Sequence, residues 1–90
     1  MNDITLEDLR TQIDQVDQQL IAALHHRMEL VKQVGVFKKR HSLPPLDQKR
    51  WQAVLDSKIA LAKQKGLDES LVHDIYERIH QTTLEIQKQI

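Results

Sequence analysis

The 90-residue sequence has no cysteine, which excludes disulfide bonds and thiolate metal ligands. It has only two glycines, two prolines and one each of Phe, Trp and Tyr, and no stretch shows the alternation of a half-buried strand. No apolar run has the length of a membrane span or stands at the N-terminus like a signal peptide, so we expect a cytoplasmic protein. The formal net charge is zero, which disfavours nucleic acid as the main partner. These absences favour one small all-α domain.

A stripe of apolar residues between positions 6 and 41 organises the chain. It recurs at spacings of three and four, which predicts one long helix with a single buried seam, about 50 Å long. Thr5 and Asp8 have the spacing of a capping box at its start, and Pro44 and Pro45 follow its end. The seam consists of Leu6, Leu9, Ile13, Val16, Leu20, Ala23, Leu30, Val34 and Phe37.

Two shorter helices are predicted after the prolines. The second begins at residue 46 or 47 and ends near residue 65, where Gly66 suits the position after a helix. The third begins near residue 69, with Asp68 as its N-cap, and continues to the C-terminus. Its apolar residues, which we expect to be buried, are Leu71, Val72, Ile75, Tyr76, Ile79, Leu84 and Ile86.

The lengths of these helices predict a homodimer. Each shorter helix spans about 30 Å, so one chain cannot cover the whole seam of the first helix. A long exposed apolar seam is a liability for a protein in water. A second copy, pairing first helix against first helix, would cover the seam, and we therefore predict an intertwined homodimer.

Arg27 is the exception in the seam, because it fills a slot where the spacing calls for an apolar residue. A guanidinium in a packed seam needs an anionic partner, which is either a ligand or an acidic residue of the second chain. Lys38 follows eleven residues later, close to the same face, and Arg10 lies seventeen residues earlier. In an antiparallel dimer, Arg10 of one chain comes alongside Arg27 and Lys38 of the other. The three cations predict a shared pocket for an anion.

Several spaced motifs together cover nearly the whole chain. They are Leu9-Arg10, Asp14-x-x-Asp17, Leu20, Arg27-x-x-Leu30-Val31, Gly35-x-x-Lys38, Pro44-x-x-Asp47-x-x-Arg50 and Thr83-x-x-x-Gln87. In these motifs the chain resembles the small all-helical chorismate mutases. The resemblance implies a single domain over residues 1–90, with three helices per subunit in an intertwined dimer. It also implies a small dianionic substrate and a reaction that needs no cofactor or metal, and the charge and hydropathy described above predict neither a nucleic-acid nor a membrane partner.

The resemblance further implies catalysis of the rearrangement of chorismate to prephenate, an intramolecular [3,3] reaction that needs no nucleophile. The protein can hold the substrate in a reactive geometry and stabilise negative charge on the ether oxygen as the C–O bond breaks. By this resemblance, Arg10 of the partner subunit and Arg27 clamp the two carboxylates. Lys38 and Gln87 donate hydrogen bonds to the ether oxygen.

The resemblance also implies a set of substrate-binding residues, namely Asp47, Arg50, Trp51 and Thr83. Asp47 helps to hold the ring hydroxyl, while Arg50 and Thr83 complete the carboxylate contacts. Trp51 departs from the family, which usually has Glu there to accept a hydrogen bond from the ring hydroxyl. Tryptophan offers only an N–H donor, so either Asp47, Gln48 or Gln52 compensates or the substrate differs at that ring position.

Three alternatives therefore stay open beside chorismate mutase. The same fold also serves 4-amino-4-deoxychorismate mutases and isochorismate-pyruvate lyases, and a non-catalytic helical dimer is the alternative from another class. Trp51 is either a core residue or part of the pocket. Gly35 is either tolerated in the helix or allows another segment to approach its backbone. His73, Glu77 and His80 share a face of the third helix, which we interpret as surface rather than as a metal site.

Overall fold

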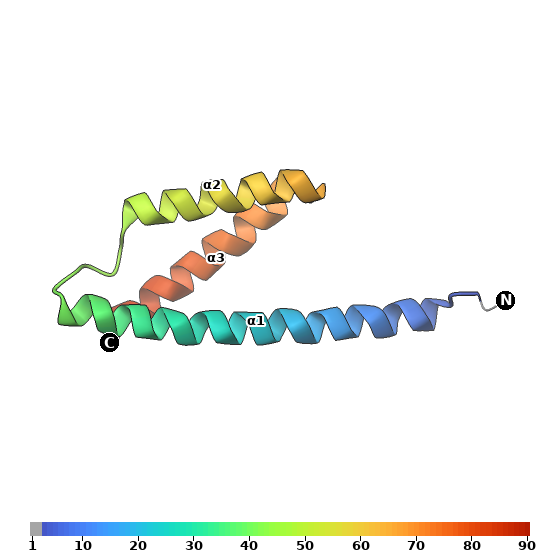
Figure 1. Cartoon of the computed structure of the whole chain (residues 1–90), viewed down its shortest axis with the longest axis horizontal. Coiled ribbons are helices and arrows are strands. Elements are labelled where there is room, and N and C mark those ends of the chain that lie inside the picture. The colour runs from blue at the N-terminus through green and yellow to red at the C-terminus, as the bar shows by residue number, and fades with distance from the viewer. Residues whose placement is uncertain (1–2) are drawn as a thin grey trace. The chain divides into compact units, whose positions relative to one another are not determined.

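The computed structural model describes residues 3–90, which form three α-helices and no strand (Figure 1). Helix α1 comprises Leu6–Arg40, α2 comprises Gln48–Lys65 and α3 comprises Glu69–Lys88. The all-α prediction is therefore confirmed, and each predicted boundary lies within about two residues of the observed one. The chain divides into two compact units at Leu30, within α1, and each unit is described below by itself. The single domain over residues 1–90 stays a prediction.

The N-terminus of α1 has the predicted capping box. The Thr5 backbone N–H donates to Asp8 Oδ2 at 3.0 Å, and the Asp8 backbone N–H donates to Thr5 Oγ1 at 3.1 Å. The bond from the Thr5 backbone N–H to the Asp8 carboxylate, and then a hydrogen bond of that carboxylate with the Thr5 side chain, lower the pKa of Asp8 below its ordinary value of 3.8. Two of the N–H groups that a helix start leaves without a partner are thus satisfied locally.

The C-terminus of α1 ends before the prolines, through a backbone motif that the sequence did not reveal. Ser42 has a left-handed backbone with φ 55°. The Leu43 N–H donates to the Lys38 carbonyl at 2.7 Å and the Ser42 N–H to the Lys39 carbonyl at 3.3 Å. This pair of bonds is a Schellman motif, which usually has glycine at the left-handed position. Pro44 and Pro45 then prevent the helix from resuming.

The predicted caps Gly66 and Asp68 are confirmed, and Asp47, for which no capping role was predicted, is the N-cap of α2. Asp47 Oδ1 accepts from the Arg50 backbone N–H at 3.0 Å, and Asp68 Oδ1 accepts from the Ser70 N–H at 2.9 Å. Gly66 ends α2 in the left-handed conformation with φ 68°, where a Cβ would be strained. Local residue chemistry therefore determines the start and the end of α2 and the start of α3.

The unit after Leu30 contains the last turns of α1 together with α2 and α3. Helix α2 packs on α3, and the C-terminal end of α3 returns to the last turns of α1 (Figure 1). Within residues 3–90 the buried apolar side chains are those of Val31, Val54 and Ala62, and Gln87 is the buried polar residue. This is a small core for a chain of 90 residues.

The apolar seam of α1 is exposed in the single chain. Leu6 is 62% exposed, Ile13 58% and Leu20 58%, and the seam residues Val34 and Phe37 are exposed as well. On α3, the prediction of a fully buried apolar face is wrong, because Leu71 and Ile75 are exposed and the other five residues are only half-buried. Within residues 3–90 these side chains stay open to water. No helix within residues 3–90 combines the length and the apolar character needed to cross a membrane.

Candidate active site

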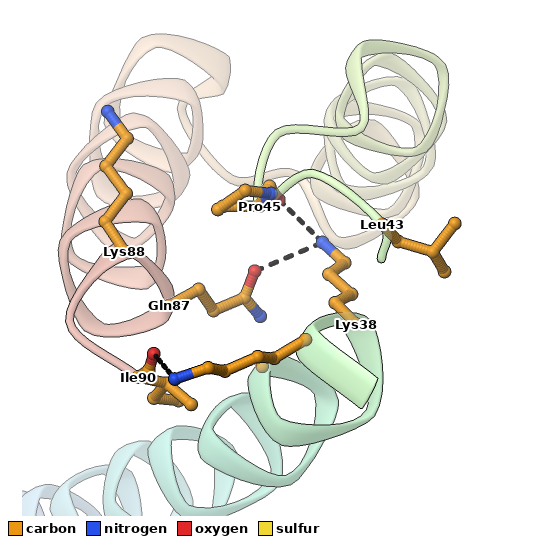
Figure 2. A pocket seen from close by; sticks show the side chains of 8 residues that line it. Lys38, Leu43, Pro45, Gln87, Lys88 and Ile90 are labelled. Carbon is orange, nitrogen blue, oxygen red and sulfur yellow. Dashed lines mark hydrogen bonds between the residues drawn. The ribbon is translucent and has the colours of Figure 1, made fainter. Parts of the chain in front are cut away.

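Lys38 and Gln87 meet in the unit after Leu30, as Figure 2 shows. Lys38 lies in the last turn of α1 and Gln87 in the last turn of α3. The Lys38 ammonium donates to Gln87 Oε1 at 3.1 Å and to the Pro45 carbonyl at 2.6 Å. Gln87 is buried, and its Nε2 donates to the Val31 carbonyl at 3.2 Å. The last turns of α1, the loop at Pro45 and the last turn of α3 thus hold one ammonium and one amide side by side.

The hydrogen bonds determine the orientation of the Gln87 amide. An ammonium has no acceptor and a backbone carbonyl has no donor, so the amide oxygen must face Lys38 and the nitrogen must face Val31. Lys38 has three N–H donors and uses two of them, and the Gln87 amide has two and uses one. Each side chain therefore retains one N–H that can bind an electron-rich oxygen of a ligand.

Gly35 allows this close arrangement of α1 and α3. A Cβ built on Gly35 would lie 2.5 Å from Ile90 Cδ1, 3.1 Å from Gln87 Cγ and 3.6 Å from Gln87 Cα. The first two distances are shorter than ordinary carbon contacts. Of the two interpretations left open by the sequence, the structure therefore supports the approach of another segment. Gly35 lets Gln87 come close enough for its amide to reach the Val31 carbonyl.

An open pocket of about 270 Å³ adjoins the Lys38–Gln87 pair. Three lysines contribute to it, and none of its lining residues is acidic, so its charge suits an anion. Lys39 differs from Lys38 in being exposed, and its ammonium donates to the Ile90 carbonyl at 2.9 Å. The lining residues are Gly35, Lys38, Lys39, Leu43, Pro45, Gln87, Lys88 and Ile90.

The start of α2 lies beside Lys38, because the Lys38 ammonium binds the carbonyl of Pro45. Asp47, two residues later, uses Oδ1 as the N-cap of α2. Arg50 is exposed in the first turn of that helix. The predicted contacts of Asp47 with a ring hydroxyl and of Arg50 with a carboxylate stay predictions, but the capping bond leaves Asp47 only part of its carboxylate for a ligand.

Trp51 stacks on His80 between α2 and α3. The ring centroids are 3.9 Å apart and the planes differ by 7°, and both residues are half-buried. The helical spacing of His73, Glu77 and His80 predicts a surface face, and so it does not predict this contact. The spacing of His80, Thr83 and Gln87, at three and then four residues, places them on one face of α3 and could have pointed to His80.

Thr83 lies between His80 and Gln87 on this face of α3. Its hydroxyl oxygen is inaccessible to water and makes no hydrogen bond with the part of the chain that the structure describes. Buried hydroxyl groups in proteins normally have a partner. The predicted role of Thr83 in substrate binding stays a prediction, because other atoms of the chain cover its hydroxyl oxygen.

Arg10 and Arg27 belong to the unit that ends at Leu30. Arg10 is exposed, whereas Arg27 is half-buried although its seam neighbour Leu30 is 47% exposed. Their predicted convergence with Lys38 on one substrate stays a prediction. As for metals, no group of three or more His, Cys, Asp or Glu side chains within residues 3–90 could hold an ion.

Residues 9–88 match the family described as chorismate mutase type II. The chain belongs to this family. The matched segment contains every predicted site residue, from Arg10 to Gln87. The resemblance noted from the spaced motifs is thereby confirmed for nearly the whole chain.

Curated proteins that are similar to this chain carry the names of different activities. The T-protein of Haemophilus influenzae is 38% identical over 73 residues, which make up 81% of this chain and 19% of that protein. The 4-amino-4-deoxychorismate mutase of Streptomyces venezuelae is 31% identical over 74 residues, or 82% of this chain and 72% of that protein. The isochorismate pyruvate lyase of Pseudomonas aeruginosa is 32% identical with the same two coverages. This chain thus spans only about a fifth of the T-protein.

Proposed function

We propose that this chain is a chorismate mutase, which converts chorismate to prephenate. The observation that carries the proposal is the Lys38–Gln87 pair, in which each side chain is held in place and retains one free N–H donor. The reaction breaks a C–O bond within one molecule, and the ether oxygen gains negative charge on the way to the transition state. Two fixed donors beside that oxygen stabilise the charge without reorganising during the reaction.

Cationic and hydroxyl groups along the site hold the dianionic substrate in a folded geometry, which brings the two reacting carbons together. Arg27 and Arg10 of the partner subunit bind the carboxylates in our proposal, since a guanidinium matches a carboxylate in shape and charge. The buried, unbonded hydroxyl of Thr83 supports its role as a further donor. Arg50 completes the carboxylate contacts, and the free oxygen of Asp47 contacts the ring hydroxyl.

The chain functions as a homodimer in this proposal. The exposed seam of α1 supports the dimer, together with a core of only three buried apolar residues within residues 3–90. So small a core rarely stabilises a domain of this size without further burial. A cytoplasmic location stays a prediction from the sequence.

The purified protein should remove the diene absorbance of chorismate and produce prephenate. A parallel assay with isochorismate, followed by the fluorescence of salicylate, separates a mutase from a lyase. Release of salicylate without turnover of chorismate would replace the mutase with the lyase. A dimer that is inactive in both assays would support the non-catalytic alternative.

Lys38→Ala should lower kcat by about 10²–10³-fold, the usual effect of removing one donor to a developing oxyanion. The KM should change much less, because the ether oxygen becomes a strong acceptor only on the way to the transition state. Lys39→Ala is the matched control, since Lys39 is the adjacent lysine and is exposed. A Lys38→Ala variant that changes only KM would make Lys38 a carboxylate anchor and contradict the mechanism.

A further inference from the structure

The end of α3 is the part of the site that its own backbone secures least. Gln87 is the last residue but one of this helix, which ends at Lys88. The Gln89 N–H donates to the Ile86 carbonyl at 3.2 Å, three residues back rather than four. The Ile90 N–H likewise donates to the Gln87 carbonyl at 3.4 Å. Terminal turns with such bonds open easily, so a donor in this turn needs support from another segment.

Ile90 supplies this support through its contact with α1. A Cβ on Gly35 would lie 2.5 Å from Ile90 Cδ1, so this methyl group occupies the space where a side chain of residue 35 would stand. Gly35 is buried, although its neighbours Val34 and Val36 are exposed. The half-buried Ile90 side chain thus covers the bare backbone of α1 and holds the turn that carries Gln87 against it.

This contact also lies next to the hydrogen bond that orients Gln87. The Gln87 Nε2 donates to the Val31 carbonyl at 3.2 Å, and that bond is buried. An α-helical carbonyl points toward the residue four positions later, which for Val31 is Gly35. Water at this carbonyl would compete with the Gln87 amide for it. By covering Gly35, Ile90 shields the bond on this side. All four residues belong to the unit after Leu30.

We infer that Ile90 is a positioning residue, whose side chain holds the Gln87 amide where it can stabilise the ether oxygen. The inference rests on the proposed function and adds an apolar side chain to the same site. Ile90 also accepts a hydrogen bond from the Lys39 ammonium through its carbonyl (Figure 2). That bond is exposed and contributes little, because water can replace it. Water forms no hydrogen bond with the Cδ1 methyl group, so it cannot replace the contact with Gly35.

The decisive measurement is kcat and KM for chorismate in variants at position 90. Ile90→Ala should lower kcat by roughly 10- to 100-fold with a much smaller change in KM, because a displaced donor matters most in the transition state. Ile90→Val lacks only Cδ1 and should lie between Ile90→Ala and the parent. Gln89→Ala is the matched control, since Gln89 is the adjacent exposed residue, and it should leave kcat unchanged. A purely structural role would lower the melting temperature without separating kcat from KM.

A double variant tests whether the contact with Gly35 is responsible. In Gly35→Ala the new methyl group meets Ile90 Cδ1, and Ile90→Val removes that atom. The contact with Gln87 Cγ at 3.1 Å is the same in both backgrounds. The loss of kcat caused by Gly35→Ala should therefore be smaller in Ile90→Val than in the parent. Losses that simply multiply would overturn the inference.

The side-chain amide of Gln87 gives a second readout that does not depend on activity. Its N–H groups, followed by NMR, should exchange with water faster in Ile90→Ala than in the parent or in Gln89→Ala. If Ile90→Ala does not fold, Ile90→Val and its double variant decide by the same measurements. Circular dichroism and thermal melting establish which variants are folded.

Parental kcat in a folded Ile90→Ala variant would overturn the inference, as would an equal loss of kcat in Gln89→Ala. Failure of the proposed function is a different result, namely a parent that turns over no chorismate. The exchange of the Gln87 amide then decides alone. Faster exchange in Ile90→Ala would support the positioning role, and equal rates in the parent and the variant would overturn it.

Discussion

At the scale of single residues, Gly35 and Gln87 together determine the geometry of the donors. Gln87 is buried and is oriented by one accepted and one donated hydrogen bond, which fixes where its remaining N–H lies. Gly35 makes that position possible, because a methyl group there would press on Gln87 Cγ and on the end of the Ile90 side chain. A residue with no functional group of its own thereby positions a residue that we assign to catalysis.

Gly35→Ala should lower kcat by up to about 10²-fold, because a displacement of Gln87 by a few tenths of an ångström or more disturbs the alignment of its donor. Helix propensity alone would stabilise α1 by about 1 kcal/mol, so the melting temperature should fall little or not at all. Val36→Ala is the control, since Val36 is the adjacent exposed residue. Unchanged kcat in Gly35→Ala would mean that the ends of Ile90 and Gln87 move aside without consequence.

At the scale of helices, each boundary depends on a few polar side chains and on two residues with left-handed backbone. Thr5, Asp47 and Asp68 begin the three helices, and Ser42 and Gly66 end α1 and α2. These motifs act within about four residues and do not require a partner helix. The boundaries were therefore predictable from the sequence, except for the left-handed Ser42, because a serine does not signal that conformation as a glycine does.

The capping box formed by Thr5 and Asp8 at the start of α1 should stabilise the helix less in acid. Asp8 has a lowered pKa in the folded chain, so its contribution to stability is fully present above the ordinary value of 3.8 and is lost as the pH falls through the lower folded value. Protonation removes the anionic acceptor of the Thr5 N–H. An NMR titration should show the Thr5 amide resonance moving with the carboxyl resonance of Asp8.

Two variants test the assignment of this titration. Asp8→Ala should abolish the acid step in the Thr5 amide resonance, because the acceptor is gone. Glu7→Gln should preserve it, since Glu7 is an acidic residue of the same turn outside the box. A step that survives in Asp8→Ala would assign the titration to another group.

At the scale of the whole molecule, the apolar seam of α1 is the surface that a single chain leaves exposed to water. The seam residues at the start of the helix are as exposed as those farther along, from Leu6 at 62% to Leu20 at 58%. A second chain that covers the seam would contribute apolar burial, which is the main favourable term in folding and association. In our proposal it would also bring its Arg10 to the site.

Mixing Arg10→Ala and Arg27→Ala chains should restore activity that each variant lacks by itself. If Arg10 serves the site of the partner subunit, every mixed dimer has one site with both arginines and one site with neither. Random exchange puts half of the chains in mixed dimers, so about a quarter of the parental activity should return.

Subunit exchange must be verified, for example by native mass spectrometry of the mixed sample. The control is a mixture of Arg27→Ala with Lys38→Ala, two residues that we assign to the same chain's site, which should restore nothing. Recovery in the control but not in the test mixture would reverse the assignment of chains. No recovery in the test mixture after exchange would place both arginines in the site of one chain.

The sequence by itself determined the three helices, most of their caps and the identity of the family. Each of these follows from periodicity, from capping residues a few positions apart, or from motifs at near gap-free spacing. It also predicted Lys38, Gln87 and Thr83 as site residues, which stays a prediction. These features are local or belong to the spaced motifs of the family, and so they can be predicted from the order of residues along the chain.

Only the tertiary structure decided which of these side chains meet and what each has left to offer a ligand. Gly35 faces Gln87 and Ile90, Trp51 stacks on His80, and the Lys38 ammonium spends two of its three donors within the chain. Each of these contacts depends on which faces of α1, α2 and α3 come together. Helical periodicity identifies a face, but it does not specify which residue of another helix will lie against it.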